Sequence, residues 1–116
     1  MTHSMGDTDI FDGLRQELRR GSLILAVLGS LRAEHYGYTL RKALAEAGVE
    51  IEEGALYPML RRLEAQGLLT SQWREEEKRN KRFYRLSPAG ADVLGRLTTE
   101  WRALGAAVDD ILKGEG

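Results

Sequence analysis

Cysteine is absent from this sequence, and histidine, aromatic residues and long hydrophobic runs are scarce. The absence of cysteine excludes a disulfide scaffold, a thiolate zinc site and a cysteine nucleophile. His3 and His35 are the two histidines, and neither has partner residues at metal-ligand spacing, so we predict no metal site. The longest apolar run, Leu23–Leu28, has six residues and is far too short to cross a membrane.

Sequence signatures of enzymes are also missing. The chain contains no phosphate-binding loop, catalytic triad or deaminase signature. Glu50, Glu52 and Glu53 lie close together, but no nucleophile or histidine accompanies them, and we interpret them as charges at the positive end of the helix that follows. We therefore expect neither an enzyme nor a cofactor. Because the N-terminus shows no signal-peptide pattern, we expect a cytoplasmic protein.

The composition fits a single folded domain of 116 residues, with one appended helix at most. Hydrophobic residues make up 42% of the chain, which is enough for a core. The net charge is −1, but residues 53–86 carry eight basic and five acidic side chains, whereas both flanking regions are acidic. A local basic patch on an acidic body is typical of a nucleic-acid-binding protein.

Two helices are predicted in the first third of the chain from the spacing of apolar residues. The first is short, because Gly21 and Ser22 are expected to break it, and Ser22 can cap the second. The second helix is buried and runs to about Arg32. The apolar stripe of the first helix consists of Phe11, Leu14 and Leu18.

The third helix follows a turn in which Gly37 is free to adopt a positive φ. It opens at Tyr38 or Thr39, and Gly48 ends it. The stretch 49–51 is too short for more than a β-bridge.

A fourth helix begins near Glu53 and ends at Gly67. Pro58 is tolerated there because it lies near the first turn. Alternating residues then predict a hairpin with strands at 68–74 and 81–86 and a charged loop at 75–80.

Ser87 and Pro88 form a strong helix start, and the last helix can run to about Leu112. This order of elements predicts a mainly α fold with a small β-hairpin, namely a winged helix-turn-helix followed by a long C-terminal dimerisation helix. We expect a disordered N-terminus at residues 1–9 and a winged helix-turn-helix DNA-binding domain, including the N-terminal helix, at residues 10–87. The dimerisation helix is expected at residues 88–116.

The fourth helix is the candidate recognition helix, since its outward face carries small residues followed by arginines. Gly54 and Ala55 let the backbone approach DNA, and a helix N-terminus favours phosphate. Arg61 can contact a guanine edge or a phosphate, and the Tyr57 hydroxyl can donate to a phosphate. An ordinary solvated arginine face is the alternative interpretation.

The hairpin loop adds a cluster of cations that can contact backbone phosphates or enter the minor groove. Glu75–Glu77 precede the cluster and either oppose DNA or pair with its arginines; a solvated charged loop is the alternative. The complete set of predicted DNA-binding residues is Tyr38, Thr39, Gly54, Ala55, Tyr57, Pro58, Arg61, Arg62, Lys78, Arg79, Lys81 and Arg82.

Apolar residues of the last helix alternate at spacings of three and four, which is a heptad seam. A helix this long cannot bury that stripe on a small winged-helix core, so we predict a homodimer. The apolar stripe of the first helix is expected to take part in the same interface. The predicted dimer interface comprises Leu14, Leu18, Leu94, Leu97, Trp101, Leu104, Val108 and Ile111.

Trp101 has two interpretations. It either fills the interface or forms one of a pair, across the two-fold axis, that sandwiches a planar aromatic ligand. Asp109 and Asp110 would favour a cationic ligand, or they simply lie on an exposed helix face. The candidate ligand-binding residues are Phe11, Leu14, Leu97, Trp101 and Leu104.

Several stretches together resemble the PadR family of transcriptional regulators. The resemblance covers about residues 18–112, and the Leu-Tyr-Pro block at 56–58 with the following Arg-Leu-Glu is specific for this family. The matching stretches are Tyr36-Gly37-Tyr38, Gly54-Ala55-Leu56-Tyr57-Pro58-Met59-Leu60-Arg61-Arg62-Leu63-Glu64, Gly67-Leu68-Leu69 and Arg82-Phe83-Tyr84-Arg85-Leu86-Ser87-Pro88-Ala89-Gly90.

The resemblance implies a dimeric, ligand-responsive repressor that binds a palindromic operator. A single C-terminal helix is similar to the short subfamily, whose multidrug-sensing members hold flat hydrophobic ligands at the dimer centre beside a tryptophan that Trp101 matches. Two features depart from the pattern: Ala55 stands where many relatives have Thr or Ser, and the wing lacks the usual Gly-Arg tip.

We therefore expect a homodimeric, sequence-specific DNA-binding regulator, a repressor relieved by a small planar hydrophobic effector. Its expected partners are double-stranded DNA and a second copy of the chain, with no membrane. The alternative is a winged-helix protein-interaction module without specific DNA binding, which the acidic balance and Glu75–Glu77 suggest.

Overall fold

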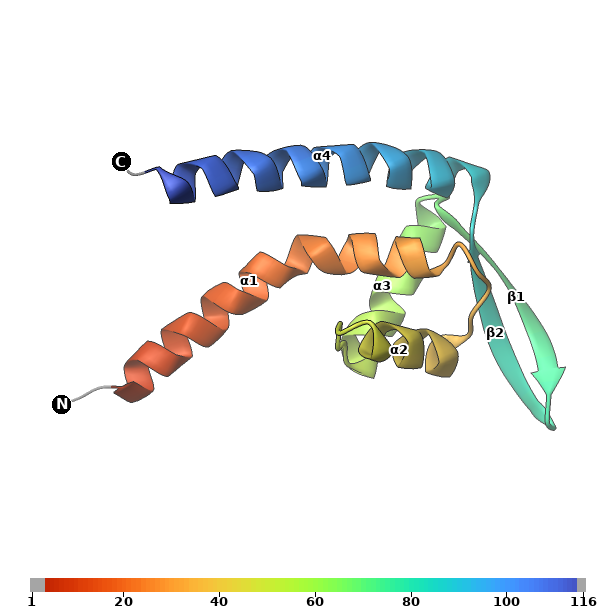
Figure 1. Ribbon diagram of the computed structural model, residues 1–116. Helices are drawn as coiled ribbons and strands as arrows, with labels where there is room; N and C mark the ends of the chain where they lie inside the picture. The colour runs from red at the N-terminus through yellow and green to blue at the C-terminus, as the bar shows by residue number, and fades with distance from the viewer. Residues whose placement is uncertain (1–3, 115–116) are drawn as a thin grey trace.

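The computed structural model describes residues 4–114, which form four helices and one antiparallel hairpin. In Figure 1, α4 runs alongside the C-terminal part of α1, while α2 and α3 lie below them and the hairpin extends to one side. The predicted mainly α fold with a small β-hairpin is confirmed. The elements are α1 (Ser4–Ser30), α2 (Gly37–Glu46), α3 (Glu53–Ala65), β1 (Leu69–Glu76), β2 (Arg79–Leu86) and α4 (Pro88–Lys113).

A core rich in leucine holds the helices against the base of the hairpin, and every element contributes to it. Truncation of a buried leucine to alanine typically costs about 2–5 kcal/mol, so this core fixes α3 relative to the hairpin. Leu94, which we assigned to a dimer interface, is instead buried here. The buried cluster consists of Val27, Leu28, Leu31, Leu40, Leu44, Leu56, Leu60, Leu63, Leu69, Tyr84 and Leu94.

The N-terminal region is one continuous helix, so the predicted break at Gly21 and Ser22 is wrong. A glycine costs a helix interior only about 1 kcal/mol relative to alanine, which packing of the neighbouring turns on the core can offset. Figure 1 shows that α1 changes direction between its two parts, and Gly/Ser pairs are common sites of such bends. The predicted disorder of residues 1–9 is also corrected, because residues 4–9 are helical. Residues 1–3 lie outside the described residues.

α2 begins at Gly37, slightly before the predicted start, and Gly48 has a positive φ of 92° just beyond its end. Gly37 does not adopt a positive φ, contrary to the prediction. It is buried because the Tyr57 ring lies against it: a Cβ added at Gly37 would come within 2.6 Å of the Tyr57 Cζ atom. The glycine is therefore needed for close packing between α2 and α3.

α3 begins at Glu53, as predicted, and Gly67 follows it with a φ of 84°. Pro58 lies inside the helix and cannot donate a hydrogen bond to the Gly54 carbonyl. The helix persists because Leu56, Leu60 and other residues of its inner face are anchored in the core.

The hairpin is longer than predicted, because the charged stretch expected as a loop continues both strands. Glu76 pairs with Arg79, so only Glu77 and Lys78 form the turn, with φ values of 55° and 66°. Two successive residues with positive φ define the turn type whose twist matches that of paired strands. At the opposite end, His35 and Tyr84 form an isolated β-bridge that attaches the hairpin to the α1–α2 connection.

α4 starts as predicted: the Ser87 hydroxyl accepts a hydrogen bond from the Gly90 amide at 2.9 Å. Gly90 lies against the Leu68 carbonyl and the Leu86 side chain, so no larger residue fits there. Within residues 4–114, the structure contains no helix that is both long and apolar enough to span a membrane.

Candidate nucleic-acid interface

The face of α3 that points away from the core is exposed to solvent and consists of small residues and arginines. Gly54, Ala55 and Pro58 are exposed, as are Arg61 and Arg62. Among the described residues, neither arginine forms an ion pair or a side-chain hydrogen bond. Their guanidinium donors are therefore available to a partner molecule.

Tyr57 is half-buried, unlike the exposed Gly54, Ala55 and Pro58 of the same helix. Its ring lies over Gly37 at the start of α2, which restricts its orientation. Tyr57 thus holds α2 and α3 together at the point where both approach the solvent-facing side.

A cavity of about 400 Å³ separates α3 from the hairpin, and we call it the helix–wing groove. Its walls carry aromatic rings and cations, and no carboxylate lines it. The lining residues are Tyr36, Gly37, Tyr57, Arg61, Trp73, Asn80, Lys81, Arg82 and Tyr84.

Arg82, a predicted DNA contact, is held within the chain. Its Nη2 donates to the Glu64 carboxylate at 3.1 Å and its Nε donates to the Ser71 hydroxyl at 2.9 Å. Ser71 in turn donates to Glu64 at 2.6 Å. This network joins α3 to both strands of the hairpin and engages the head group that was expected to contact phosphate.

Lys81 is likewise engaged. Its ammonium donates to the Tyr36 hydroxyl at 3.3 Å and lies 3.5 Å from Glu76 and 3.7 Å from Glu77. The hydrogen bond to Tyr36 raises the pKa of Lys81 above its ordinary value, and the two carboxylates act in the same direction. Glu76 and Glu77 therefore pair with a lysine of the wing, whereas one sequence interpretation expected these glutamates to pair with arginines.

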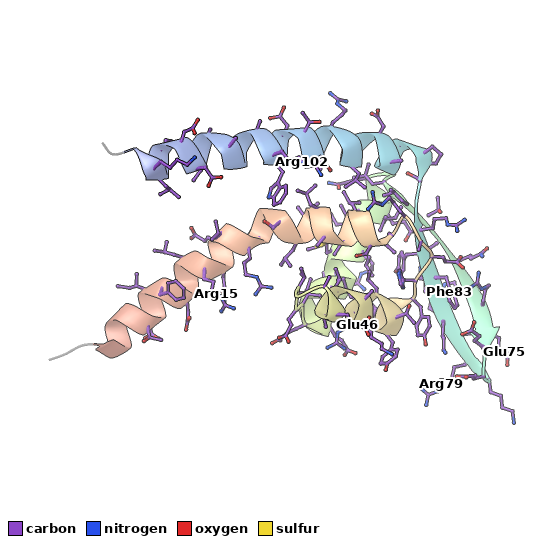
Figure 2. All side chains as sticks on the ribbon, viewed as in Figure 1. Arg15, Glu46, Glu75, Arg79, Phe83 and Arg102 are labelled. Atoms are coloured by element: carbon purple, nitrogen blue, oxygen red, sulfur yellow. The ribbon has the colours of Figure 1, made fainter. Side chains whose placement is uncertain are left out.

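The hairpin tip carries two further cations that have no ion-pair partner among the described residues. Lys78 and Arg79 are exposed, and Figure 2 shows Arg79 at the free end of the hairpin. These two cations and the arginines of α3 are exposed without ion-pair partners, and Glu75–Glu77 are also exposed near the tip.

On α2, Tyr38 is 62% exposed, in keeping with a contact surface. The Thr39 side chain, in contrast, is occupied within the chain. Its hydroxyl donates to the Tyr36 carbonyl and accepts from the Tyr36 amide, and His35 Nδ1 lies 3.0 Å away. These bonds begin α2 and use the capacity of the hydroxyl. The Thr39 hydroxyl, a predicted DNA contact, is therefore engaged within the chain.

Sequence reasoning missed three residues of this surface. Lys42 is exposed one helical turn after Tyr38, and the spacing of four residues could have revealed it. Trp73 and Asn80 line the helix–wing groove, but their placement depends on the hairpin register, which the sequence did not define.

Gly54 and Ala55 line a different hollow, between α1 and the start of α3. Arg15, Arg19 and Arg41 contribute to its walls, together with Glu50 and Glu52. Arg19 donates to the Glu50 carbonyl and Arg41 pairs with Glu53 at 3.1 Å, so this hollow is close to charge balance.

The predicted dimer residues other than Leu94 are exposed in the single chain. The exposed fractions of Leu18 and Ile111 are 79% and 76%, and that of Trp101 is 53%. These side chains form unpartnered apolar rows along α1 and α4. The remaining members of the rows are Leu14, Leu97, Leu104 and Val108.

Of the candidate ligand residues, Trp101 alone lines a cavity of about 380 Å³ between α1 and α4. Leu25 and Leu94 contribute apolar walls, and Arg102 lies at its edge, on the side of α4 that faces α1 (Figure 2). The structure of one chain does not bring the other candidates into this cavity; they are Phe11, Leu14, Leu97 and Leu104.

Comparison with known proteins shows which family this chain resembles in sequence. The family model described as the transcriptional regulator PadR-like family matches residues 24–96. The chain is similar to transcriptional regulator Rv3488 of Mycobacterium tuberculosis, with 37% identity over 101 residues, which cover 86% of this chain and 92% of the relative.

Solved structures of PadR family regulators are also similar to this chain. A PadR family transcriptional regulator from Eggerthella lenta is 40% identical, with a TM-score of 0.91 over 97% of this chain and 100% of its own. A PadR-like transcription factor from Bacteroides fragilis is 30% identical, with a TM-score of 0.72 over 85% of this chain and 98% of its own. These likenesses confirm the predicted winged helix with a long C-terminal helix.

Proposed function

Because this chain belongs to the PadR-like family of transcriptional regulators, we propose that it binds a palindromic operator in double-stranded DNA as a homodimer. Proteins of this family are transcriptional regulators and not enzymes. The observation that carries the proposal is the unpaired arginine pair on the outer face of α3, beside a hairpin whose tip is also cationic.

In the proposed complex, α3 enters the major groove and the hairpin tip reaches the neighbouring minor groove. Arg61 and Arg62 supply the donors for base edges and phosphates, while the small residues Gly54 and Ala55 allow the start of α3 to approach the DNA. Lys78 and Arg79 contact phosphates and carry no sequence information.

Selection of genomic fragments by the purified protein tests this proposal. We expect an enriched palindrome whose affinity falls steeply with salt, because each phosphate contact releases a counterion. If the folded protein enriches no fragment even at low salt, DNA binding is excluded, and the protein-interaction module becomes the better account.

The homodimer is proposed from the apolar rows on α1 and α4. Leu104 and Ile111 are 65% and 76% exposed, and continuous exposed apolar patches on a soluble surface usually mark an interface. A second copy can cover them, since α4 extends beyond the chain's own core. The two-fold symmetry of the dimer would then match that of the operator.

We further propose that the regulator is a repressor relieved by a planar hydrophobic effector at the dimer centre. The support is Trp101, a half-exposed indole that already lines a cavity within one chain. Filling the centre would change the angle between the two wings, and by linkage the effector and the operator would weaken each other's binding.

Quenching of tryptophan fluorescence by planar dyes tests the effector site. Trp73 also emits, so Trp101→Ala is the necessary control. We expect this variant to bind the dyes at least tenfold more weakly, because it removes the stacking surface. Unchanged dye affinity would remove Trp101 from the effector site.

A further inference from the structure

Trp73 is a large side chain on β1 that the core of the chain does not use. Its indole is 61% exposed and lines the helix–wing groove opposite Tyr57 and Arg61 of α3. The strand register pairs Trp73 with Arg82. Because paired residues share one face of a hairpin, and Arg82 reaches Glu64 of α3, Trp73 is also on the face turned toward α3.

The geometry of duplex DNA indicates what this groove holds. The major and minor grooves of a duplex are separated by one sugar–phosphate strand. If α3 lies in the major groove and the hairpin reaches the adjacent minor groove, that strand must pass between α3 and the hairpin. The helix–wing groove is the space between these elements.

We propose, on the basis of the function proposed above, that the helix–wing groove clamps one sugar–phosphate strand and that Trp73 is a direct backbone contact. The indole ring packs on a deoxyribose, and its N–H donates to a phosphate oxygen. Asn80 and Tyr57 contribute further neutral donors from the two walls.

The charges around the groove favour an anionic occupant. Its lining includes no carboxylate, and Arg61 has no ion-pair partner among the described residues. The carboxylates that pair with lining residues are Glu64, Glu76 and Glu77, which bind Arg82 and Lys81. Phosphate therefore meets one unpaired cation and several neutral donors.

Arg82 acts here as a positioning residue. Glu64 and Ser71 fix its head group, which lies 5.4 Å from the centre of the Trp73 ring. The guanidinium lies beside the indole and restrains its orientation through a cation–π contact.

A backbone contact by a neutral side chain has a distinctive signature. Because the backbone carries no sequence information, Trp73→Ala should weaken binding to a random-sequence duplex and to the selected operator by the same factor, about tenfold. The slope of affinity against salt should not change, since the indole neutralises no phosphate. Loss of Arg61 should instead reduce that slope or the ratio between the two affinities.

The experiment compares wild type, Trp73→Ala and Gln72→Ala on both duplexes at several salt concentrations, by fluorescence anisotropy of labelled DNA. Gln72 is the matched control, because it is an exposed neighbour on the other face of β1 and does not line the groove. Circular dichroism and sedimentation confirm that each variant remains folded and dimeric. In a second measurement, Trp73→Phe should bind DNA more tightly than Trp73→Ala, because it keeps an aromatic ring, but should lose the change in tryptophan emission that DNA causes in the wild type.

The outcomes separate this inference from the proposed function. A wild type that binds DNA while Trp73→Ala binds equally tightly would overturn the Trp73 assignment alone. The same holds if Trp73→Ala weakens the operator but not the random duplex, or if Trp73→Phe keeps the full emission change. A wild type that binds neither duplex at low salt would overturn both proposals.

Discussion

At the residue scale, the candidate interface depends on close packing behind it. Gly37 has no side chain, and the Tyr57 ring occupies the space that a Cβ would fill. Tyr57 and Arg61 are neighbours on α3, four residues apart, and both line the helix–wing groove.

We predict that Gly37→Ala destabilises the chain by about 1–3 kcal/mol, because the added methyl group displaces the Tyr57 ring. Urea denaturation measures this change. Gly21→Ala is the matched control: nothing lies within 4 Å of its added Cβ, and removing a helical glycine should stabilise the chain by up to about 1 kcal/mol. Equal stability of Gly37→Ala and wild type would contradict the packing role.

At the element scale, the hairpin is the element whose turn is hardest to predict from the sequence. Its turn consists of Glu77 and Lys78, both with a positive φ, where glycine and asparagine are the preferred residues. A residue with a Cβ costs roughly 1–2 kcal/mol in this conformation. The wing therefore folds with local strain, which the strand pairs and the network around Arg82 must offset.

Replacing the turn by Asn-Gly, as Glu77→Asn with Lys78→Gly, should stabilise the chain by about 1 kcal/mol. Thermal denaturation should show a midpoint several degrees higher. Lys78→Val is the opposing control, because a β-branched residue fits a positive φ poorly and should lower the midpoint. A midpoint that falls in the Asn-Gly variant would show that the turn is not strained.

Much of the element order could be predicted, since the apolar spacing of α3 and the Ser87-Pro88 start of α4 are local signals. Long-range contacts could not be predicted. The partners of Arg82 and Lys81 come from α3, the α1–α2 connection and the other strand. Because the sequence shows the cations but not these partners, it predicts more unpaired positive charge on the wing than the structure has. The merging of the first two predicted helices into α1 likewise depends on packing that outweighs one glycine.

At the scale of the whole molecule, the apolar rows of α1 and α4 have no partner within the described chain. Their exposure is typical of a surface that a second copy covers, and α4 places them away from the proposed DNA-facing surface (Figure 1). The proposed dimer contact and the proposed DNA contact therefore use separate surfaces, which allows each to be tested independently.

We predict that Leu104→Asp converts the proposed dimer to a monomer, because it places a charge in the apolar row of α4. Sedimentation velocity should then show a mass near 13.0 kDa instead of twice that value. Thr99→Asp introduces the same charge on the exposed outer face of α4 and should remain dimeric. A dimeric Leu104→Asp variant would place the interface elsewhere.

The most direct test of the central claim is a titration of the selected operator with wild type and with Arg61→Ala/Arg62→Ala across a salt series. We expect the double variant to bind about 100-fold more weakly while remaining folded and dimeric, because it loses the unpaired donors of α3. Arg96→Ala/Lys113→Ala removes the same charge from α4 and should bind like wild type. Operator binding that survives unchanged in Arg61→Ala/Arg62→Ala would contradict the assignment of α3 as the recognition helix.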